Sequence, residues 1–393
     1  MKKLLAATAA SALFAGMAQA ADVKIGILYG FTGPIESLTG SMAAASEAAI
    51  EEVNASGLFM DGSKVSAIRA DSTCIDSAAA TAAAEKLVTS DGVSGILGGD
   101  CSGVTGAVLS NVAVPNGIVM ISPSATSPAL STAEDNGLFF RTAPSDAREG
   151  EIAADILLER GFKTAALTYS NSDYGKGLAE AIQTSYEAKG GKITISAAHE
   201  DGKADYSAEV AALASAGGDI LIVAGYLDQG GAGVIRASVD TGAFSVYELP
   251  GGMIGDNLTK NVPTGLEGSF GQVPGNDSPG LKKLGEMSGG KFDVTSPYTP
   301  ESYDAAALML LAMEAAKSTK GTDYAGKIME IANAPGEPIG PGELGKALQL
   351  IKDGKDIDYV GASAVEFVGS GESAGNYREI TVKDNKIETV KYR

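Results

Sequence analysis

Short apolar segments alternate with alanine-rich segments along the first part of this chain, and the alternation limits the folds that it can adopt. Strands are expected at Val23–Tyr29, Val65–Ala70, Val93–Leu97 and Gly117–Ile121. Helices are expected between them, at Ser41–Ser56, Ser77–Thr89 and Val104–Val112. Buried strands that alternate with helices form a parallel sheet covered by helices on both faces. The sequence therefore predicts an α/β fold.

The same rhythm restarts after Phe139–Ser145, which we interpret as a crossover into a second lobe. Four further strands are expected at Thr164–Tyr169, Lys192–Ala197, Asp219–Ala224 and Ser245–Leu249. After about residue 272 the pattern is mainly helical, and it ends in a predicted hairpin of Tyr377–Lys383 and Lys386–Tyr392. A chain of 393 residues is long enough for two domains. We predict two doubly wound parallel-sheet lobes.

The first twenty residues have the pattern of a signal peptide. Lys2 and Lys3 precede an apolar stretch, Leu4–Met17, that is too short to span a bilayer comfortably. The small-x-small cleavage site Ala18-Gln19-Ala20 follows. We predict cleavage after Ala20 and export of a soluble protein to the periplasm.

The chain is acidic, with a formal net charge of −19 that becomes −21 when Lys2 and Lys3 are removed. Such a charge repels nucleic acids and anionic membrane surfaces, so neither is expected as a partner. It is typical of an exported protein that must stay soluble at high abundance.

Two segments place small hydroxyl residues and glycines directly after predicted strands. The first runs from Gly95 to Thr105, and the second from Ile121 to Pro128. Both open onto helices or turns, whose free N–H groups and positive dipole ends attract carboxylates and other small anions. Adjacent strand ends at the rim of a parallel sheet favour a small-molecule site. Ser102 and Thr126 are therefore candidate ligand contacts, although each also suits a capping role.

Cys74 and Cys101 are the only cysteines, and both follow predicted strands of one βαβ unit. In an oxidising compartment an even pair favours a disulfide bond. A metal site is not expected, because two thiolates and one distant histidine do not make a ligand set.

Catalytic motifs are weak in this chain. Gly99–Gly103 is not the G-x-S-x-G turn of a nucleophile, and the only histidine, His199, lies in a polar stretch where we expect it at the surface. No phosphate-binding loop or G-x-G-x-x-G opens the first helix. We predict a protein that is not an enzyme and that needs no cofactor.

Several short motifs, in a fixed order and spacing, resemble those of one family. They are Ile25-Gly26-Ile27, Phe31-Thr32-Gly33-Pro34, Cys74 with Cys101-Ser102, Ile121-Ser122-Pro123-Ser124-Ala125-Thr126, Phe140-Arg141-Thr142, Asp173-Tyr174-Gly175-Lys176-Gly177 and Glu301-Ser302-Tyr303-Asp304-Ala305-Ala306. With them the chain after residue 20 resembles the periplasmic branched-chain amino-acid binding proteins of ABC importers, which have the type I periplasmic-binding-protein fold.

The resemblance implies two lobes joined by three crossovers, with the ligand between them. The crossovers are expected near Arg141–Pro144, Gly271–Gly275 and Gly369–Asn376. The predicted division is a signal peptide at 1–20, lobe one at 21–142 and 272–370, and lobe two at 143–271 and 371–393. The family disulfide corresponds to Cys74 and Cys101.

The resemblance also implies how a ligand is held. In the family the ligand carboxylate is bound by a backbone group and a hydroxyl that match Ser102. The backbone at Ser124 and the hydroxyl of Thr126 match groups around the α-amino and carboxylate ends of the ligand. Tyr174 and Tyr226 match aromatic residues that the second lobe places over the ligand.

The chain departs from the family at the acid that accepts the ligand's α-ammonium, because the matching place is Gly251 or its neighbour Gly252. Asp256 and Asp228 are alternative acceptors. Asp100 stands where leucine-binding members have an apolar residue, and a buried carboxylate is costly unless it is paired. We therefore hypothesise that Asp100 faces a ligand nitrogen. Weaker candidates for contact are Leu38, Thr39, Tyr298, Glu301 and Tyr303.

The resemblance leads us to expect an exported solute-binding receptor for a small amino acid or a related nitrogen-bearing carboxylate. Such a receptor is expected to be a monomer, to close its lobes around the ligand by a hinge, and to deliver it to an ABC permease in the inner membrane. One alternative is an extracytoplasmic sensory protein on the same fold. Another is a binder of an amide, a urea or an aromatic carboxylate.

Overall fold

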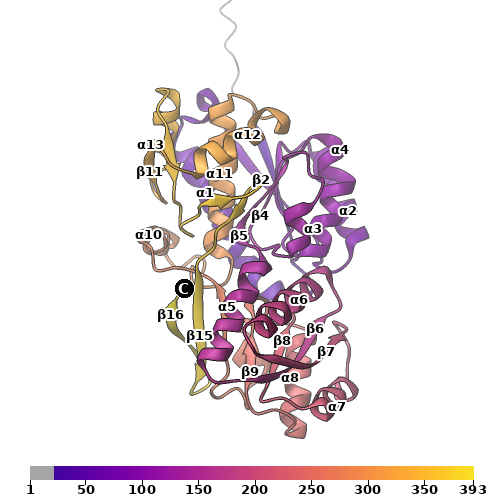
Figure 1. Cartoon of the computed structure of the whole chain (residues 1–393). Helices are drawn as coiled ribbons and strands as arrows, with labels where there is room; N and C mark the ends of the chain where they lie inside the picture. The colour runs from indigo at the N-terminus through magenta and orange to yellow at the C-terminus, as the bar shows by residue number, and fades with distance from the viewer. Residues whose placement is uncertain (1–21) are drawn as a thin grey trace, which may run out of the picture.

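The computed structural model describes residues 22–393, so the predicted signal peptide lies outside the described residues. Two lobes lie one above the other, and each is built around a seven-stranded sheet (Figure 1). The first sheet contains, in spatial order, β13 (Phe367–Val368), β14 (Glu372–Ser373), β5 (Phe139–Pro144), β4 (Met120–Ser122), β3 (Gly95–Gly98), β1 (Val23–Tyr29) and β2 (Val65–Asp71). All neighbouring pairs in it are parallel except β13 and β14.

The second sheet repeats this plan. It contains, in spatial order, β16 (Lys386–Tyr392), β15 (Tyr377–Lys383), β10 (Phe270–Pro274), β9 (Tyr247–Leu249), β8 (Ile220–Ala224), β6 (Thr164–Ser170) and β7 (Lys192–His199). Five strands are parallel, and β15 and β16 add an antiparallel hairpin at one edge. The central strands are short apolar runs buried on both faces, as parallel strands between helix layers must be. The predicted fold class is confirmed.

Helices cover the faces of both sheets. Those of the first lobe are α1 (Glu36–Ser56), α2 (Ser77–Lys86), α3 (Ser102–Val108), α4 (Val114–Asn116), α10 (Pro279–Ser288), α11 (Thr299–Ala316), α12 (Gly321–Ala332) and α13 (Leu344–Lys352), together with the small sheet of β11 (Glu337–Ile339) and β12 (Ile357–Tyr359). Those of the second lobe are α5 (Asp146–Glu159), α6 (Asp173–Ala188), α7 (Ser207–Ala216), α8 (Gly230–Thr241) and α9 (Leu258–Asn261).

The deepest helix is α11, which is buried from Thr299 to Glu314. It contacts the first sheet at β3, β4 and β5, and it is covered by α1, α12 and α13. This explains why its sequence from Ala305 to Met313 is apolar on every side instead of on one stripe.

The chain passes between the lobes three times, as the predicted fold requires. It leaves the first sheet after β5, returns after β10, and leaves again between β14 and β15. The three lobe boundaries of the predicted division each fall a few residues early. Ala143 and Pro144 still belong to β5 of the first sheet, residues 272–274 to β10 of the second, and Glu372 and Ser373 to β14 of the first. The last crossover therefore lies between Ser373 and Tyr377.

His199 is not at the surface, which corrects the prediction. It is the last residue of β7, is 1% exposed, and its Nδ1 lies 2.9 Å from the Thr168 hydroxyl. The polar sequence around it indicated a surface position, but the pairing of β7 with β6 turns the ring inward. Burial lowers the pKa of His199 to about 4. Within residues 22–393, no helix has the length and apolarity needed to cross a membrane.

Candidate functional site

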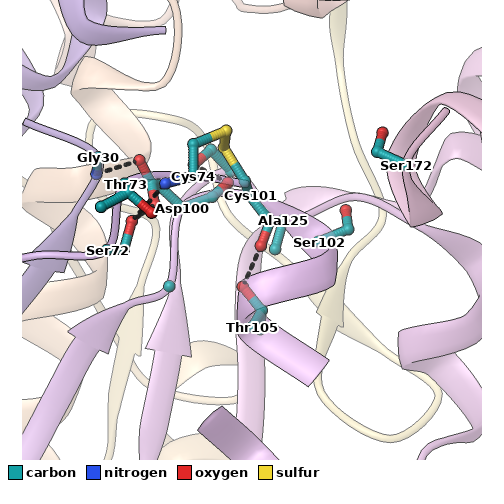
Figure 2. The surroundings of a disulfide bond; sticks show 12 residues. Gly30, Ser72, Thr73, Cys74, Asp100, Cys101, Ser102, Thr105, Ala125 and Ser172 are labelled. Carbon is teal, nitrogen blue, oxygen red and sulfur yellow. Dashed lines mark hydrogen bonds between the residues drawn. A yellow bond between two sulfur atoms is a disulfide. The ribbon is translucent and has the colours of Figure 1, made fainter. Parts of the chain in front are cut away.

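The loop between β3 and α3 is held by a disulfide bond and a buried carboxylate (Figure 2). Cys74 and Cys101 are joined, which fastens the segment after β2 to the start of α3. Next to them, the Asp100 carboxylate accepts hydrogen bonds from the Gly30 N–H at 2.6 Å and from the Ser72 hydroxyl at 2.7 Å. Asp100 therefore ties together the ends of β1, β2 and β3.

The Asp100 carboxylate is thus engaged by the protein, and the hypothesis that it faces a ligand nitrogen stays a prediction. The residue is 1% exposed, and each carboxylate oxygen already accepts a hydrogen bond from the protein. Burial raises its pKa, and these donors oppose that rise. The buried Asp100 carboxylate is paired, as its burial requires, and its partners are the Gly30 N–H and the Ser72 hydroxyl of the protein itself.

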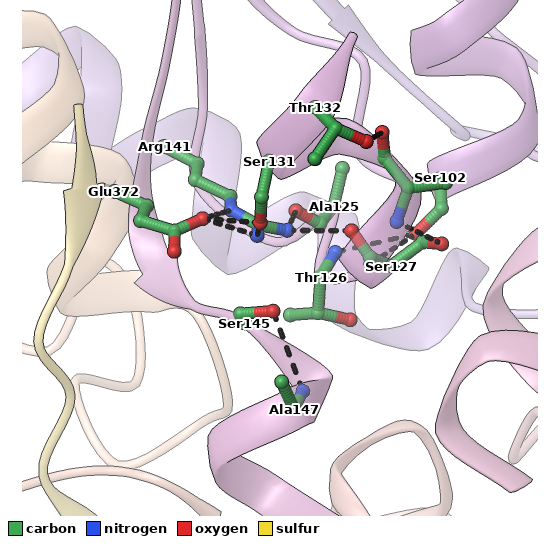
Figure 3. Close-up of polar contacts among 11 residues, drawn as sticks. Ser102, Ala125, Thr126, Ser127, Ser131, Thr132, Arg141, Ser145, Ala147 and Glu372 are labelled. Carbon is green, nitrogen blue, oxygen red and sulfur yellow. Dashed lines mark hydrogen bonds and ion pairs between the residues drawn. The ribbon is translucent and has the colours of Figure 1, made fainter. Parts of the chain in front are cut away.

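The two strand-end segments predicted as a carboxylate-binding seat lie side by side (Figure 3). The Ser102 hydroxyl, at the first residue of α3, accepts hydrogen bonds from the N–H groups of Thr126 at 3.2 Å and Ser127 at 3.1 Å. The Ser124 hydroxyl donates to the carbonyl of Asp100 at 2.8 Å. The first N–H groups of α3 have no partner within the helix. We call the segment 102–103 with 124–127 the hydroxyl seat.

Arg141 on β5 donates hydrogen bonds to the backbone of the hydroxyl seat (Figure 3). Its guanidinium is 1% exposed and donates to the carbonyls of Ala125 at 3.2 Å and Ser127 at 3.0 Å. It also pairs with the Glu372 carboxylate of β14 at 2.5 Å. By contrast, the Thr126 hydroxyl is buried and has no hydrogen-bond partner.

The second lobe contributes two stacked tyrosines. Tyr174 is the second residue of α6, and Tyr226 follows β8. Their ring centroids are 5.0 Å apart at an interplanar angle of 28°, and both residues are about 5% exposed or less. The Tyr174 hydroxyl accepts a hydrogen bond from the Gly252 N–H at 3.0 Å. Burial raises the pKa of both phenols above their usual range, so both stay neutral at ordinary pH.

Two carboxylates that the sequence analysis did not single out lie on the first turn of α5. Asp146 is 0% exposed, and neither of its oxygens has a hydrogen-bond partner. Glu149 is 1% exposed, and its Oε1 accepts from the Gly251 N–H at 2.8 Å and from the Gln272 amide at 3.1 Å. Burial raises the pKa of Glu149 to about 7 and, together with the charge of Glu149, raises that of Asp146. We call Asp146 and Glu149 the α5 acid pair.

The α5 acid pair adjoins both lobes. The Asp146 N–H donates to the carbonyl of Thr126 at 2.8 Å, which places the pair beside the hydroxyl seat. Its charges act on the phenols of Tyr174, Tyr298 and Tyr377, and the Tyr377 hydroxyl is buried without a partner. Glu248 on β9 is also buried without a partner, and burial raises its pKa to about 8. Within residues 22–393, no three metal-ligating side chains converge on a common point.

The remaining sequence candidates have other surroundings. Asp256 is exposed, and Gly251 contributes its N–H to Glu149. Asp228 links the lobes directly, because its carboxylate accepts from the Ser37 N–H at 3.0 Å and its own N–H donates to the Pro34 carbonyl at 3.0 Å. Asp228 also accepts from the Asn257 amide, so it is engaged within the protein.

Of the weaker candidates, Tyr298 is close to the site. Its hydroxyl lies 2.7 Å from the point that a Cβ at Gly251 would occupy. Tyr303 instead hydrogen-bonds Glu52, away from the seat. A cleft of about 300 Å³ borders Tyr226 and is lined from both lobes, by Cys74 and Gly103 on one side and by Asp173 on the other.

Comparison with known proteins agrees with this architecture. Residues 22–344 match the model of a family described as periplasmic binding protein. The chain is 30% identical over 283 residues to the Leu/Ile/Val-binding protein of Escherichia coli (strain K12), covering 70% of this chain and 75% of that protein. It is 31% identical over 331 residues to the Leu/Ile/Val-binding protein homolog 1 of Brucella melitensis, covering 82% and 86%.

Solved structures share the fold at lower identity. A leucine binding protein from Thermotoga maritima superposes with a TM-score of 0.79 at 19% identity, covering 94% of this chain and 98% of that chain. A solute binding protein of an ABC transporter from R. palustris, in complex with 4-hydroxybenzoate, superposes with a TM-score of 0.74 at 17% identity, covering 95% and 97%.

Proposed function

This chain belongs to the periplasmic binding protein family, and from that premise we propose that it is the solute-binding receptor of an ABC importer. It captures a small amino acid or a related nitrogen-bearing carboxylate between its two lobes. The relatives' names support the ligand class, since several are Leu/Ile/Val-binding proteins. The protein performs no chemistry, works as a monomer in the periplasm, and hands its ligand to a permease.

One observation carries this proposal: buried polar groups meet between the lobes without protein partners. The Thr126 hydroxyl of the first lobe and the Asp146 carboxylate of the second lie beside each other, and neither has a hydrogen-bond partner elsewhere in the protein. Folded proteins satisfy nearly all buried polar groups, so groups left over at a lobe interface point to a ligand. The ligand carboxylate is assigned to the hydroxyl seat, where helix N–H groups attract an anion.

The connections between the lobes support the proposed hinge closure. Three chain segments cross between them, and Asp228 hydrogen-bonds across the interface to Ser37. A ligand that contacts both lobes stabilises the closed arrangement by binding it better than the open one.

An aromatic carboxylate is a second candidate ligand. The stacked Tyr174 and Tyr226 rings provide a flat apolar surface, and one structural neighbour is a complex with 4-hydroxybenzoate. The α5 acid pair argues against it, because such a ligand offers no cation to the two carboxylates.

A ligand screen tests the proposed function. The protein after residue 20 is mixed with amino acids, amides, ureas and aromatic carboxylates, and its melting temperature is measured. A true ligand raises the melting temperature by mass action, and calorimetry then gives its affinity and stoichiometry. We expect 1:1 binding of at least one carboxylate, accompanied by a smaller radius of gyration in X-ray scattering. A screen in which no compound changes the melting temperature contradicts the proposal.

A further inference from the structure

The α5 acid pair lies where the ligand's nitrogen end is expected. Glu149 reaches the N–H of Gly251, at the position where the sequence lacks an acid after β9. A Cβ at Gly251 would lie 3.6 Å from both carboxylate oxygens of Glu149 and 2.7 Å from the Tyr298 hydroxyl. The space for a side chain at Gly251 is therefore filled from α5 and from Tyr298. Glu149 on α5 thus supplies an acid at the place where the segment after β9 lacks one.

The charges around the pair are not balanced by the protein. The cation acting on Asp146 in the described chain is Arg141, whose donors are already bonded to Glu372 and to the carbonyls of Ala125 and Ser127. Glu149 receives two neutral donors, both on Oε1. Neither carboxylate has a cationic partner in hydrogen-bond contact. Buried carboxylates require a cation or a proton, because burial without either is very costly.

We propose that Asp146 and Glu149 form the receptor for a positively charged nitrogen of the ligand, so that the site between the lobes selects carboxylates that also carry an ammonium, amidinium or guanidinium group. This inference rests on the proposed function and names the feature by which the ligand is chosen. Charge-assisted hydrogen bonds to the two carboxylates fix that end, and the hydroxyl seat fixes the carboxylate end. Tyr174, Tyr226 and Tyr298 cover the space between the α5 acid pair and the hydroxyl seat.

The opposing account is that both acids stay protonated and donate to a neutral group of the ligand. The two accounts differ in the effect of removing the ligand's amine. Matched probes separate them: L-leucine against 4-methylpentanoate, L-phenylalanine against 3-phenylpropanoate, and 4-(aminomethyl)benzoate against 4-hydroxybenzoate. Each pair keeps the carboxylate and changes the cationic nitrogen.

Binding of these probes is measured by calorimetry with the whole protein after residue 20 and with three variants. Glu149→Gln and Asp146→Asn remove one charge each and keep the side-chain size. Glu151→Gln is the matched control, because Glu151 lies on the same helix with its side chain 56% exposed. We expect an amine-bearing probe to bind at least tenfold more tightly than its partner. That ratio should fall at least fivefold in either site variant and less than twofold in the control.

Every outcome decides the matter. A probe without an amine that binds as tightly as its partner overturns the inference and leaves the proposed function standing. Unchanged ratios in both site variants also overturn it. If none of the six probes binds but another compound of the screen does, that compound is compared with its amine-free form in the same way. If no compound of the screen binds, the proposed function fails and the inference fails with it. If neither site variant folds, the ratio measured with the unaltered protein alone is decisive.

Discussion

On the first-lobe side of the site the polar groups mostly bond to one another, whereas on the second-lobe side two buried carboxylates lack a cation. Ser102, Asp100 and Arg141 all have internal partners, and the disulfide fixes the loop that carries the first two. Asp146 has none. The first lobe is thus preorganised, while the second depends on a ligand or protons to balance its charge. We therefore expect substitutions at the site to affect the free energy of unfolding and the ligand affinity to different extents, depending on the lobe that is altered.

The largest effect is expected from Arg141→Ala. It leaves two loop carbonyls and the Glu372 carboxylate without their donor, and breaking a buried pair should lower the free energy of unfolding by about 3 kcal/mol. Urea denaturation measures this. Arg148→Ala is the control, since its exposed pair with Glu151 should contribute less than about 1 kcal/mol. Equal losses in the two variants would show that the first lobe does not depend on the buried guanidinium.

Thr126→Val tests the one hydroxyl of the first-lobe seat that has no partner. The change keeps the shape and removes the hydroxyl, so we expect the unfolding free energy to change by less than about 0.5 kcal/mol. Binding of the carboxylate found in the screen should weaken by about 2 kcal/mol, the loss of one hydrogen bond to a charged group. Calorimetry and denaturation on the same samples provide both numbers. Lost stability with unchanged binding would assign Thr126 to the scaffold.

The pH dependence of the free protein tests the second lobe. Burial raises the pKa of Glu149 to about 7 and of Glu248 to about 8 from the ordinary value of 4.5, so their contribution to stability is full below about pH 4.5 and is lost as the pH rises from there to about 7 and 8. Between pH 6.5 and 8.5 we expect the unfolding free energy to fall by about 1 kcal/mol or more. His199, with its pKa lowered to about 4, stays neutral there.

The ligand should reverse this trend. A cationic ligand needs ionised carboxylates, so its affinity should rise with pH over the same window. Other titratable groups lie near Glu149. Asp146 shares the site and its pKa is also raised, and burial raises the pKa of Glu301 to about 8. The phenols of the neighbouring tyrosines stay neutral over this window. Glu149→Gln should flatten the affinity profile and should reduce the pH dependence of stability to the part that Glu248 contributes. A stability that rises with pH in the free protein contradicts the unpaired state of the second-lobe acids.

The smallest effect is expected from Asp256→Asn. This residue is exposed, so its charge should contribute less than about 0.5 kcal/mol to binding. A loss comparable to that of Glu149→Gln would return the nitrogen-binding role to the segment after β9 and remove it from α5.

The sequence predicted the fold well because its signals are local. Buried apolar runs and alanine-rich helices recur with a regular period, and each predicts its own element. The hydroxyl seat was also predictable, since Ser102 and Thr126 directly follow strands whose ends meet at one sheet edge. Tyr174 and Tyr226 came from the family resemblance, and the structure brings their rings together.

What the sequence did not predict depends on contacts between distant segments. The partners of Asp100 come from Gly30 and Ser72, and no local pattern marks that convergence. Asp146 and Glu149 do not stand out in the sequence, because acids in the first turn of a helix usually serve the helix dipole in solvent. Their spacing of three residues, directly after a crossover, was the available signal.

The Asp228 contacts to Ser37 and Pro34 have a consequence for the amount of ATP that the proposed importer would use per solute molecule. They join the lobes with hydrogen bonds that need no ligand, and under the proposed hinge closure they would narrow the free-energy gap between the empty open and empty closed forms. A narrower gap leaves more of the binding energy for affinity. It also increases the fraction of empty receptors that resemble loaded ones, so a permease that recognises the closed shape would hydrolyse more ATP without cargo. For the proposed receptor, Asp228 would thus raise the affinity for a scarce solute and lower the fidelity of delivery.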